Sequence, residues 1–340
     1  MMIKSVHFFI AFFAVLSPSC NAQNAKAKDI TEGYPAVDSL ILRKGDSLLK
    51  ARNLPGIFIA TSDNGKRSYY NFGYADPDNK TTFDSLTFFE AGSITKTFTA
   101  LVLVSVLKEH GISEASSIIK YLPDSLQQNK SLASVSFLSL LNHTSGLERI
   151  PDDLPRGIKN QQPYKEYKKK NLFSYLKRAT CKSDGKSNYS NTGFAVCGIL
   201  AEIISGKTYE ELLKQYAFEP LHMGAALNLP SGNTNVSQGH FGNNKAPYWE
   251  MECMAAAGAI KCSAQDLLNY LEYMNNHSGD AVIRSLLKTT AAAKPNIKVC
   301  LAWHTVEKEG NPLFYWHNGG LMGFPPLQPF QRRKIKLWWW

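Results

Sequence analysis

The chain is organised around the stretch Glu90-Ala-Gly-Ser-Ile-Thr-Lys-Thr-Phe-Thr-Ala-Leu-Val-Leu-Val-Ser-Val-Leu-Lys108. Its pattern predicts a short approach, a glycine, and then a helix from about Ser93 to Leu107. A helix that is so uniformly apolar is normally buried in the middle of a domain. Its first turn nevertheless carries Ser93 and Lys96, and the i to i+3 spacing places both on one face. A hydroxyl beside an amine at the start of a buried helix is a candidate nucleophile and base.

The Ser-x-x-Lys pattern alone has little specificity. It occurs seven times, beginning at Ser47, Ser93, Ser105, Ser117, Ser174, Ser183 and Ser285. A serine after a glycine also serves as a helix N-cap, and a lysine one turn later is usually solvated. The rest of the chain therefore has to distinguish Ser93 from the other six serines.

Length and composition indicate a globular protein with a sizeable core, in one large domain or two interleaved ones. Part of the net charge of +10 comes from two basic clusters, at 165–170 and 332–336. The first is typical of a solvated loop, and the second lies in an unusual tail. No nucleic-acid motif accompanies these clusters, so we predict no nucleic-acid partner.

The N-terminus has the order of a secretory signal peptide: a positive charge, an apolar run over residues 6–16, and then small and polar residues. We predict cleavage after Ala22; attachment of lipid to Cys20 is less favoured, because Ser17-Pro18-Ser19 is a poor context for it. The run is too short to span a bilayer, and no other segment has enough uninterrupted apolar residues. The protein is therefore expected to be secreted or periplasmic, without a membrane span.

Removal of the signal peptide leaves five cysteines: Cys181, Cys197, Cys253, Cys262 and Cys300. Their odd number and irregular spacing do not make a disulfide framework, and no pair has zinc-finger spacing. One bridge is compatible with this set, but no pairing is assigned. The histidines form no spaced ligand set either, so we predict neither a metal nor a cofactor.

The segments before the central helix predict a helix and a β-hairpin. Apolar periodicity predicts the helix over Val37–Ala51. Two β-branched and aromatic runs, Ile57–Thr61 and Ser68–Tyr74, are joined through Asp63-Asn64-Gly65, which is a strong hairpin signal.

The middle of the chain is mainly helical, and short strands return near the end. Further helices are predicted at Thr192–Ser205, Tyr209–Phe218 and Ser263–Asn275, and strands at Val299–His304 and Leu313–His317. Ile112–Leu122, which Pro123 ends, and Val135–Leu141 are shorter segments of the same mainly helical region. Strands at both ends with helices between them favour an α+β fold, a sheet domain interrupted by a helical insertion. The expected segments are a signal peptide (1–22), a linker (23–36), the first part of an α/β subdomain (37–92), a mostly helical subdomain (93–250), the second α/β part (251–324) and an aberrant tail (325–340).

Tyr189-Ser-Asn191 lies in a polar loop just before one of these predicted helices. By itself the motif is typical of a tyrosine that packs on the core while Asn191 caps a helix. Alternatively, the phenol relays a proton and the amide orients a substrate carbonyl.

His317-Asn-Gly-Gly320 follows a predicted strand and has two interpretations as well. Paired glycines are typical of a turn that ends a hairpin. They also leave a bare strand edge that a substrate backbone can approach, with the Gly320 N–H directed at an oxyanion.

In three motifs, Ser93-Ile-Thr-Lys96, Tyr189-Ser-Asn191 and His317-Asn-Gly319, the chain resembles the superfamily of serine β-lactamases and penicillin-binding proteins. The order and separations of these motifs are similar to those in the class C β-lactamase and D-alanyl-D-alanine carboxypeptidase-like branch. The likeness covers about residues 35–325 and includes Leu-Leu-Asn-His-Thr-Ser-Gly-Leu at 140–147. It implies a β-lactamase/transpeptidase-like fold, with an antiparallel sheet flanked by helices and a helical insertion.

The resemblance also implies roles for these residues. Ser93 is expected to attack an amide or ester carbonyl and form an acyl-enzyme, while Lys96 and Tyr189 move its proton to the leaving group. The N–H groups of Ser93 and Gly320 are expected to form the oxyanion hole. Asn191, His317 and Gly319 are expected to hold the substrate. That substrate is a small molecule or a peptidoglycan peptide: a β-lactam, a D-amino-acid peptide or a small ester.

Two features depart from the family pattern. His317 stands where class C β-lactamases usually have lysine, and a largely neutral histidine weakens the anchor for a substrate carboxylate. After Phe324 the proline-rich, basic and aromatic tail lacks the alternation of a strand, so the last sheet strands and C-terminal helix are predicted to be missing. The codons of the final three tryptophans, shifted by one base, encode valines, and we hypothesise a frameshift. The alternative to an enzyme is a truncated, non-catalytic pseudoenzyme or weak binder of cell-wall peptides.

Overall fold

The computed structural model describes residues 8–12, 35–52, 54–155, 162–241, 244–294, 296–308 and 310–321. The predicted cleavage site after Ala22, the lipid site at Cys20 and the tail at 325–340 lie outside these residues. Among the described helices, none combines the length and the hydropathy needed to cross a bilayer. The five cysteines of the described chain are all free thiols.

The described chain contains both helices and strands. The α-helices are α1 (Pro35–Arg52), α2 (Thr95–Glu109), α3 (Asp124–Gln127), α4 (Phe137–Leu141), α5 (Lys169–Arg178), α6 (Asn191–Ser205), α7 (Tyr209–Leu213), α8 (Ala255–Gly258), α9 (Ala264–Asn276) and α10 (Ala281–Leu287). Short 3-10 helices are η1 (Gly92–Ile94), η2 (Ile119–Tyr121) and η3 (Lys130–Ser134), and η5 (Lys214–Phe218) is a π-helix. The strands are β1 (Phe8–Phe12), β2 (Gly56–Asp63), β3 (Lys66–Gly73), β4 (Phe89–Glu90), β5 (Gly239–Phe241), β6 (Asn244–Ala246), β7 (Lys261–Cys262), β8 (Ala291–Lys294), β9 (Ile297–Val299), β10 (His304–Lys308) and β11 (Asn311–Trp316).

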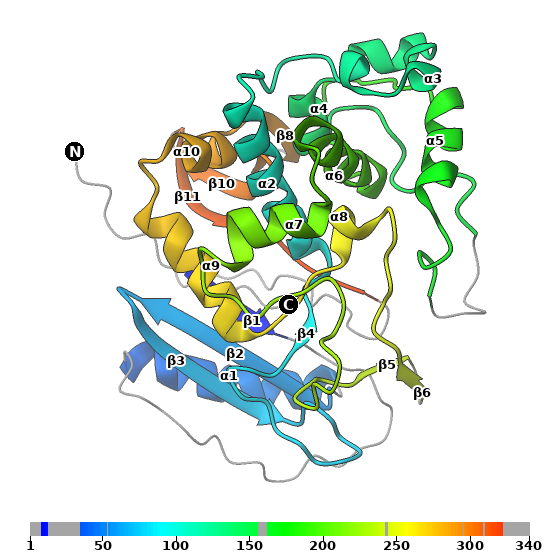
Figure 1. Cartoon of the computed structure of the whole chain (residues 1–340). Helices are drawn as coiled ribbons and strands as arrows, with labels where there is room; N and C mark the ends of the chain where they lie inside the picture. Colours follow the sequence, from blue (N-terminus) through cyan, green and yellow to red (C-terminus); the bar gives the residue numbers. More distant parts are fainter. Residues whose placement is uncertain are drawn as a thin grey trace.

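The predicted α+β architecture is confirmed, with strands toward both ends of the chain and helices between them (Figure 1). In the described residues the strands lie in separate sheets: β1-β2-β3, β11-β10-β9-β8, and the pairs β4-β7 and β5-β6. The hairpin predicted from the Asp63-Asn64-Gly65 turn is confirmed as β2–β3, and it packs against α1 and α9. Asn64 and Gly65 both have positive φ, at 50° and 81°, which suits a two-residue hairpin turn.

Strand β1 is an element that the sequence did not predict. It pairs antiparallel with β2, with Phe12 opposite Phe58 and Phe8 opposite Ser62. These residues fall within the segment predicted as a signal peptide. An apolar run suits both a signal peptide and a strand beside an apolar neighbour, so its composition does not separate the two roles. The signal peptide remains a prediction.

The predicted strand Val299–His304 is wrong. Val299 ends β9, His304 begins β10, and these two residues pair across a hairpin whose turn contains the intervening segment. Ala302 in this turn has a φ of 65°, a left-handed conformation that a strand cannot contain. The predicted strand at 313–317 is confirmed in its main part by β11.

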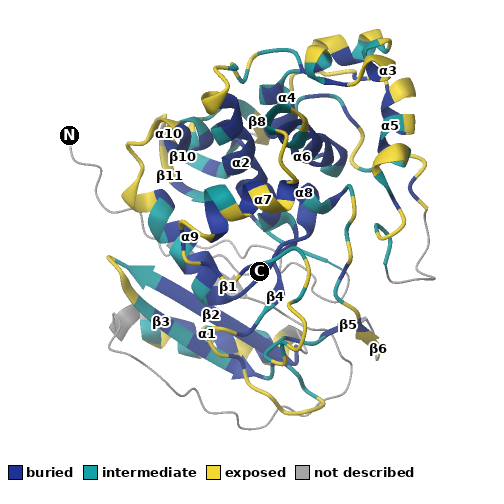
Figure 2. Cartoon of the chain, viewed as in Figure 1, coloured by how far each residue is buried: buried dark blue, intermediate teal, exposed yellow. Residues whose placement is uncertain are grey.

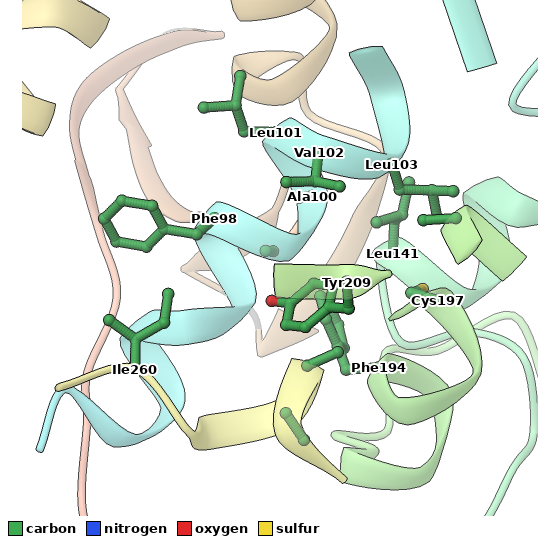
Figure 3. Packing of buried hydrophobic residues seen from close by; sticks show 14 of the residues in the cluster. Phe98, Ala100, Leu101, Val102, Leu103, Leu141, Phe194, Cys197, Tyr209 and Ile260 are labelled. Atoms are coloured by element: carbon green, nitrogen blue, oxygen red, sulfur yellow. The ribbon is translucent and has the colours of Figure 1, made fainter. Parts of the chain in front are cut away.

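Helix α2 forms the centre of the core. Figure 2 shows it as a buried element enclosed by other helices, and it contacts α6, α7, α8 and α10. Figure 3 shows the packing around it, where Phe98 and Leu103 project toward different neighbours. The Phe98 ring stacks on Tyr270 of α9, with the ring centroids 4.0 Å apart. Apolar residues on all sides of this helix therefore find partners, as the sequence predicted.

Local capping signals define several helix ends. The predicted start of α9 is confirmed, because Ser263 and Asp266 form a capping box. Helix α6 ends at Gly206, which has a φ of 71° as expected of a C-cap glycine. Its N-cap is Ser190, whose hydroxyl accepts from the Gly193 N–H, so the interpretation of Asn191 as the cap is wrong.

Candidate active site

Ser93 lies in η1, immediately before α2, rather than in the first α-helical turn as predicted. The reason is the backbone of the preceding residue. Gly92 has a φ of 52°, and this left-handed conformation makes a tight turn just before the helix. Ser93 remains partly exposed, whereas Lys96 in the first turn of α2 is fully buried. The hydroxyl of Ser93 is therefore accessible from solvent, whereas the amine of Lys96 is not.

The Lys96 amine lies against the Ser93 hydroxyl. Lys96 Nζ is 3.1 Å from Ser93 Oγ and donates to the Ala257 carbonyl at 2.5 Å. Burial, with a smaller contribution from the charge of Arg149, holds the pKa of Lys96 well below its usual range. A neutral amine in this place can accept the proton of Ser93.

The Tyr189 hydroxyl reaches the same serine from another part of the fold. Tyr189 Oη donates to Ser93 Oγ at 2.6 Å, and Lys96 Nζ lies 4.8 Å from the centre of the Tyr189 ring. Burial raises the pKa of the phenol, while the hydrogen bond to Ser93 and the charge of Arg149 oppose that rise. Hydroxyl, amine and phenol therefore meet at one point.

Asn191 is the first residue of α6, two positions after Tyr189. Its backbone N–H donates to the Arg149 carbonyl at 2.8 Å. Its side-chain Oδ1 is buried and has no hydrogen-bond partner among the described residues. Buried polar atoms are normally paired, so this amide is suited to binding a group that comes from outside the chain.

The turn after β11 lies against the approach to Ser93. A Cβ atom placed on Gly319 would be 2.1 Å from the Ala91 carbonyl oxygen, and one placed on Gly92 would be 2.9 Å from the Gly320 nitrogen. His317 is buried, and its ring centre is 6.5 Å from that of Tyr189. The structure thus brings Ser93, Lys96, Tyr189 and the turn at 317–320 together, and Asn191 follows Tyr189 by two positions.

A family model described as "Beta-lactamase" matches residues 41–325 of this sequence. The chain belongs to the beta-lactamase family. It is 24% identical over 229 residues to a beta-lactamase of Providencia stuartii, covering 66% of this chain and 56% of that protein. It is 28% identical over 250 residues to a beta-lactamase of Pseudomonas fluorescens, covering 73% and 66%.

Two further proteins are similar to this chain. Penicillin-binding protein 4* of Bacillus subtilis (strain 168) is 28% identical over 183 residues, which cover 52% of this chain and 39% of that protein. The fold matches a crystal structure titled beta-lactamase/D-alanine carboxypeptidase from Pseudomonas syringae, with a TM-score of 0.69 at 24% identity, over 81% of this chain and 76% of that one. The chain therefore spans about two thirds or less of the length of these curated relatives.

Three residues beside the motifs were not predicted as part of the site. His143 accepts from the Ser190 N–H at 3.1 Å through Nδ1, and its ring centre lies 4.5 Å from that of Tyr189. The Arg149 guanidinium carbon lies 4.9 Å from the centre of the same tyrosine ring. Tyr164 packs edge-on against Trp249, and its phenol interacts with the Asn191 side chain. Of these three residues, only His143 lies in a segment that the family resemblance had singled out, at 140–147.

A buried hydrogen-bond chain positions the carbonyl that holds Lys96. Thr99 Oγ1 donates to the Ala256 carbonyl at 2.7 Å and shares a hydrogen bond of 2.6 Å with the Tyr209 hydroxyl. Ala257, the next residue of α8, accepts from Lys96. Contacts from α2 and α7 therefore set the position of the amine.

Within the described chain, no group of three or more His, Cys, Asp or Glu side chains is suited to a metal ion. The reactive groups that meet at Ser93 are a hydroxyl, an amine and a phenol.

Replacing Gly319 with alanine is expected to lower esterase activity about 100-fold. The new Cβ would lie 2.1 Å from a backbone oxygen, so either the end of β11 or the approach to Ser93 has to move. Hydrolysis of a p-nitrophenyl ester measures the loss. Gly279→Ala is the control, because a Cβ there meets no atom within 4 Å. A Gly319→Ala variant as active as Gly279→Ala would show that this close approach does not position the site.

Acid is expected to destabilise the fold through His304. Burial lowers the pKa of His304 to about 4, against a usual value of 6.5. Between these values the unfolded chain binds a proton that the folded chain does not. The free energy of unfolding therefore falls as the pH drops from about 6.5 toward 4, by about 3 kcal/mol from this group.

Urea unfolding at several pH values tests this expectation. His304→Gln should flatten the decline in unfolding free energy below pH 6.5 relative to the wild type. His110→Gln changes an exposed histidine and should leave the decline as it is. Equal slopes for the wild type and His304→Gln would contradict the assignment.

Proposed function

We propose that this chain is a serine hydrolase that forms an acyl-enzyme through Ser93 on an amide or ester substrate. The observation that carries the proposal is the meeting at Ser93 Oγ of Lys96 Nζ, at 3.1 Å, and Tyr189 Oη, at 2.6 Å. Such an arrangement of nucleophile, base and proton relay is what acyl transfer requires. Membership of the beta-lactamase family supports the same reaction class.

In the proposed mechanism, Lys96 accepts the Ser93 proton as the hydroxyl oxygen attacks the substrate carbonyl. The N–H groups of Ser93 and Gly320 stabilise the negative oxygen of the tetrahedral intermediate. Lys96 and Tyr189 then pass the proton to the leaving amine or alcohol. Water, activated at Tyr189, attacks the ester bond to Ser93 and releases the acyl group.

Binding of the substrate is assigned to residues around this centre. Asn191 supplies an amide whose buried oxygen lacks a protein partner among the described residues. His317 and Gly319 border the site at the end of β11. Burial holds the pKa of His317 well below its usual range, so this histidine is neutral at pH 7 and does not serve as a cationic anchor. The candidate substrates are a β-lactam, a D-amino-acid peptide or a small ester.

We further propose that the chain is exported, with cleavage of a signal peptide after Ala22. The charged, apolar and small-residue order of the N-terminus supports this step. Mass spectrometry of protein recovered from a bacterial periplasm tests it. A mature chain that still begins at Met1 would contradict it.

Covalent labelling tests the proposed reaction. Purified protein is incubated with a fluorophosphonate and with a fluorescent penicillin, and turnover is followed with nitrocefin and p-nitrophenyl esters. Labelling that maps to Ser93 supports the proposal, and the preferred reagent identifies the substrate class. A cooperatively folded protein that neither reagent labels would favour a non-catalytic binder of cell-wall peptides.

A further inference from the structure

The charges around Ser93 are positive rather than balanced. Four groups there have shifted pKa values: Lys96, His143, Tyr189 and His317. In the described part of the chain, no carboxylate contributes to any of these shifts. Arg149 contributes to the first three, and in each case its positive charge lowers the pKa. The site therefore favours a negative group that arrives from outside.

Arg149 is the charge at this site that persists at neutral pH. Burial lowers the pKa values of Lys96, His143 and His317, which disfavours their charged forms. A guanidinium cannot be deprotonated under the same conditions. The Arg149 side chain is exposed, so a ligand can reach it from solvent.

The position of Arg149 is set by its backbone. Its carbonyl accepts from the N–H groups of Asn191, at 2.8 Å, and of Thr192, at 3.4 Å. These bonds connect Arg149 to the start of α6, beside the Asn191 side chain that we assign to substrate binding. The guanidinium carbon lies 4.9 Å from the centre of the Tyr189 ring, within the range of a cation–π contact.

Arg149 also has its hydrogen-bonding capacity available. Among the described residues no carboxylate lies within ion-pair distance of it, whereas Arg67 pairs with Glu272 and Arg178 with Asp152. A free guanidinium presents a planar fork of N–H donors that matches the two oxygens of a carboxylate.

We propose that Arg149 binds a carboxylate in the acyl part of the substrate and thereby selects acidic substrates. This inference rests on the proposed acylation of Ser93. It places the anionic anchor at the start of α6, next to Asn191 and Tyr189, instead of at the end of β11 where His317 lies. The acyl carbonyl would then bind between Ser93 and Asn191, with the acid directed to the guanidinium.

A matched pair of esters tests the proposal. p-Nitrophenyl valerate and the p-nitrophenyl monoester of glutaric acid have acyl chains of equal length, and only the second ends in a carboxylate. For the wild type we expect a higher kcat/KM on the acidic ester. In Arg149→Met the ratio of acidic to neutral kcat/KM should fall about tenfold, as expected for loss of a charged hydrogen bond. The ratio for Arg149→Lys should lie between those of the wild type and Arg149→Met, because lysine keeps the charge but lacks the planar fork of N–H donors.

Lys120→Met is the matched control. Lys120 is an exposed cation 5.0 Å from the centre of the Tyr121 ring on η2, so its replacement removes the same charge and a similar ring contact. The ratio should stay at the wild-type value in this variant. An unchanged ratio in Arg149→Met, or an equal fall in Lys120→Met, would overturn the proposal.

Binding to the Ser93→Ala variant separates this inference from the proposed reaction. Calorimetry with both esters, which this variant does not cleave, should show tighter binding of the acidic one and loss of that preference on adding Arg149→Met. If the wild type cleaves neither ester but this preference is present, the reaction is wrong and the anionic site stands. Equal binding of the two esters to Ser93→Ala would overturn the site.

Discussion

Replacing Ser93 with alanine is expected to abolish labelling by a fluorophosphonate and to reduce ester hydrolysis by about 10⁴-fold or more. The variant lacks the atom that forms the acyl bond, and Lys96 and Tyr189 then have no hydroxyl to act on. Ser93 is partly exposed and lies before α2, so alanine there leaves the core packing unchanged. Gel fluorescence measures the labelling, and release of p-nitrophenol measures turnover.

The control for Ser93 lies in α2, the helix that follows it. Ser105 begins another Ser-x-x-Lys sequence, ending at Lys108, in the last two turns of α2. Ser105→Ala is expected to label and turn over like the wild type. If Ser93→Ala keeps its labelling, the nucleophile is a different residue. If both variants lose it while circular dichroism shows intact helices, the site has been misassigned.

Replacing Lys96 with methionine is expected to reduce turnover by about 10²–10⁴-fold, the usual contribution of a general base. Methionine is also unbranched and fills much of the same buried space, so the loss reports on the amine rather than on packing. In the wild type the lowered pKa of Lys96 favours the neutral amine at a lower pH than an exposed lysine would allow, and activity should rise as the pH increases through that pKa. A pH–rate profile measures this limb, which should disappear in Lys96→Met.

Lys108→Met provides the comparison for this variant. Lys108 is exposed at the last turn of α2, so its replacement removes one positive charge without entering the site. Its pH–rate profile should match that of the wild type. A Lys96→Met variant that keeps the rising limb would assign the base to another group, with Tyr189 the first candidate because its hydroxyl also touches Ser93.

Local signals predicted much of the secondary structure. The apolar run of α2, the Asp63-Asn64-Gly65 hairpin and the Ser263 capping box act over a few residues, and each is confirmed. The error at 299–304 has a local cause too. Its residues are apolar enough for a strand, but the left-handed Ala302 makes a turn that apolarity does not reveal.

The proposed catalytic centre is different, because its members are far apart in the sequence. Tyr189 follows Ser93 by 96 positions, and their hydrogen bond exists because α2 packs against α6. The order of the three motifs predicted which residues belong together through the family resemblance. It did not predict the neighbouring residues His143 and Arg149, which contact the Tyr189 ring.

The amino-acid sequence by itself determined the helix that begins beside Ser93, and it singled out that serine among seven similar ones through Tyr189 and His317. Only the tertiary structure decided that Ser93 lies in a tight turn before the helix, that Lys96 is fully buried, and that Arg149 reaches the site. Periodicity and capping act within one element and can be read along the chain. Burial, pKa shifts and unpaired charges depend on which elements pack together, and therefore arise only in the folded molecule.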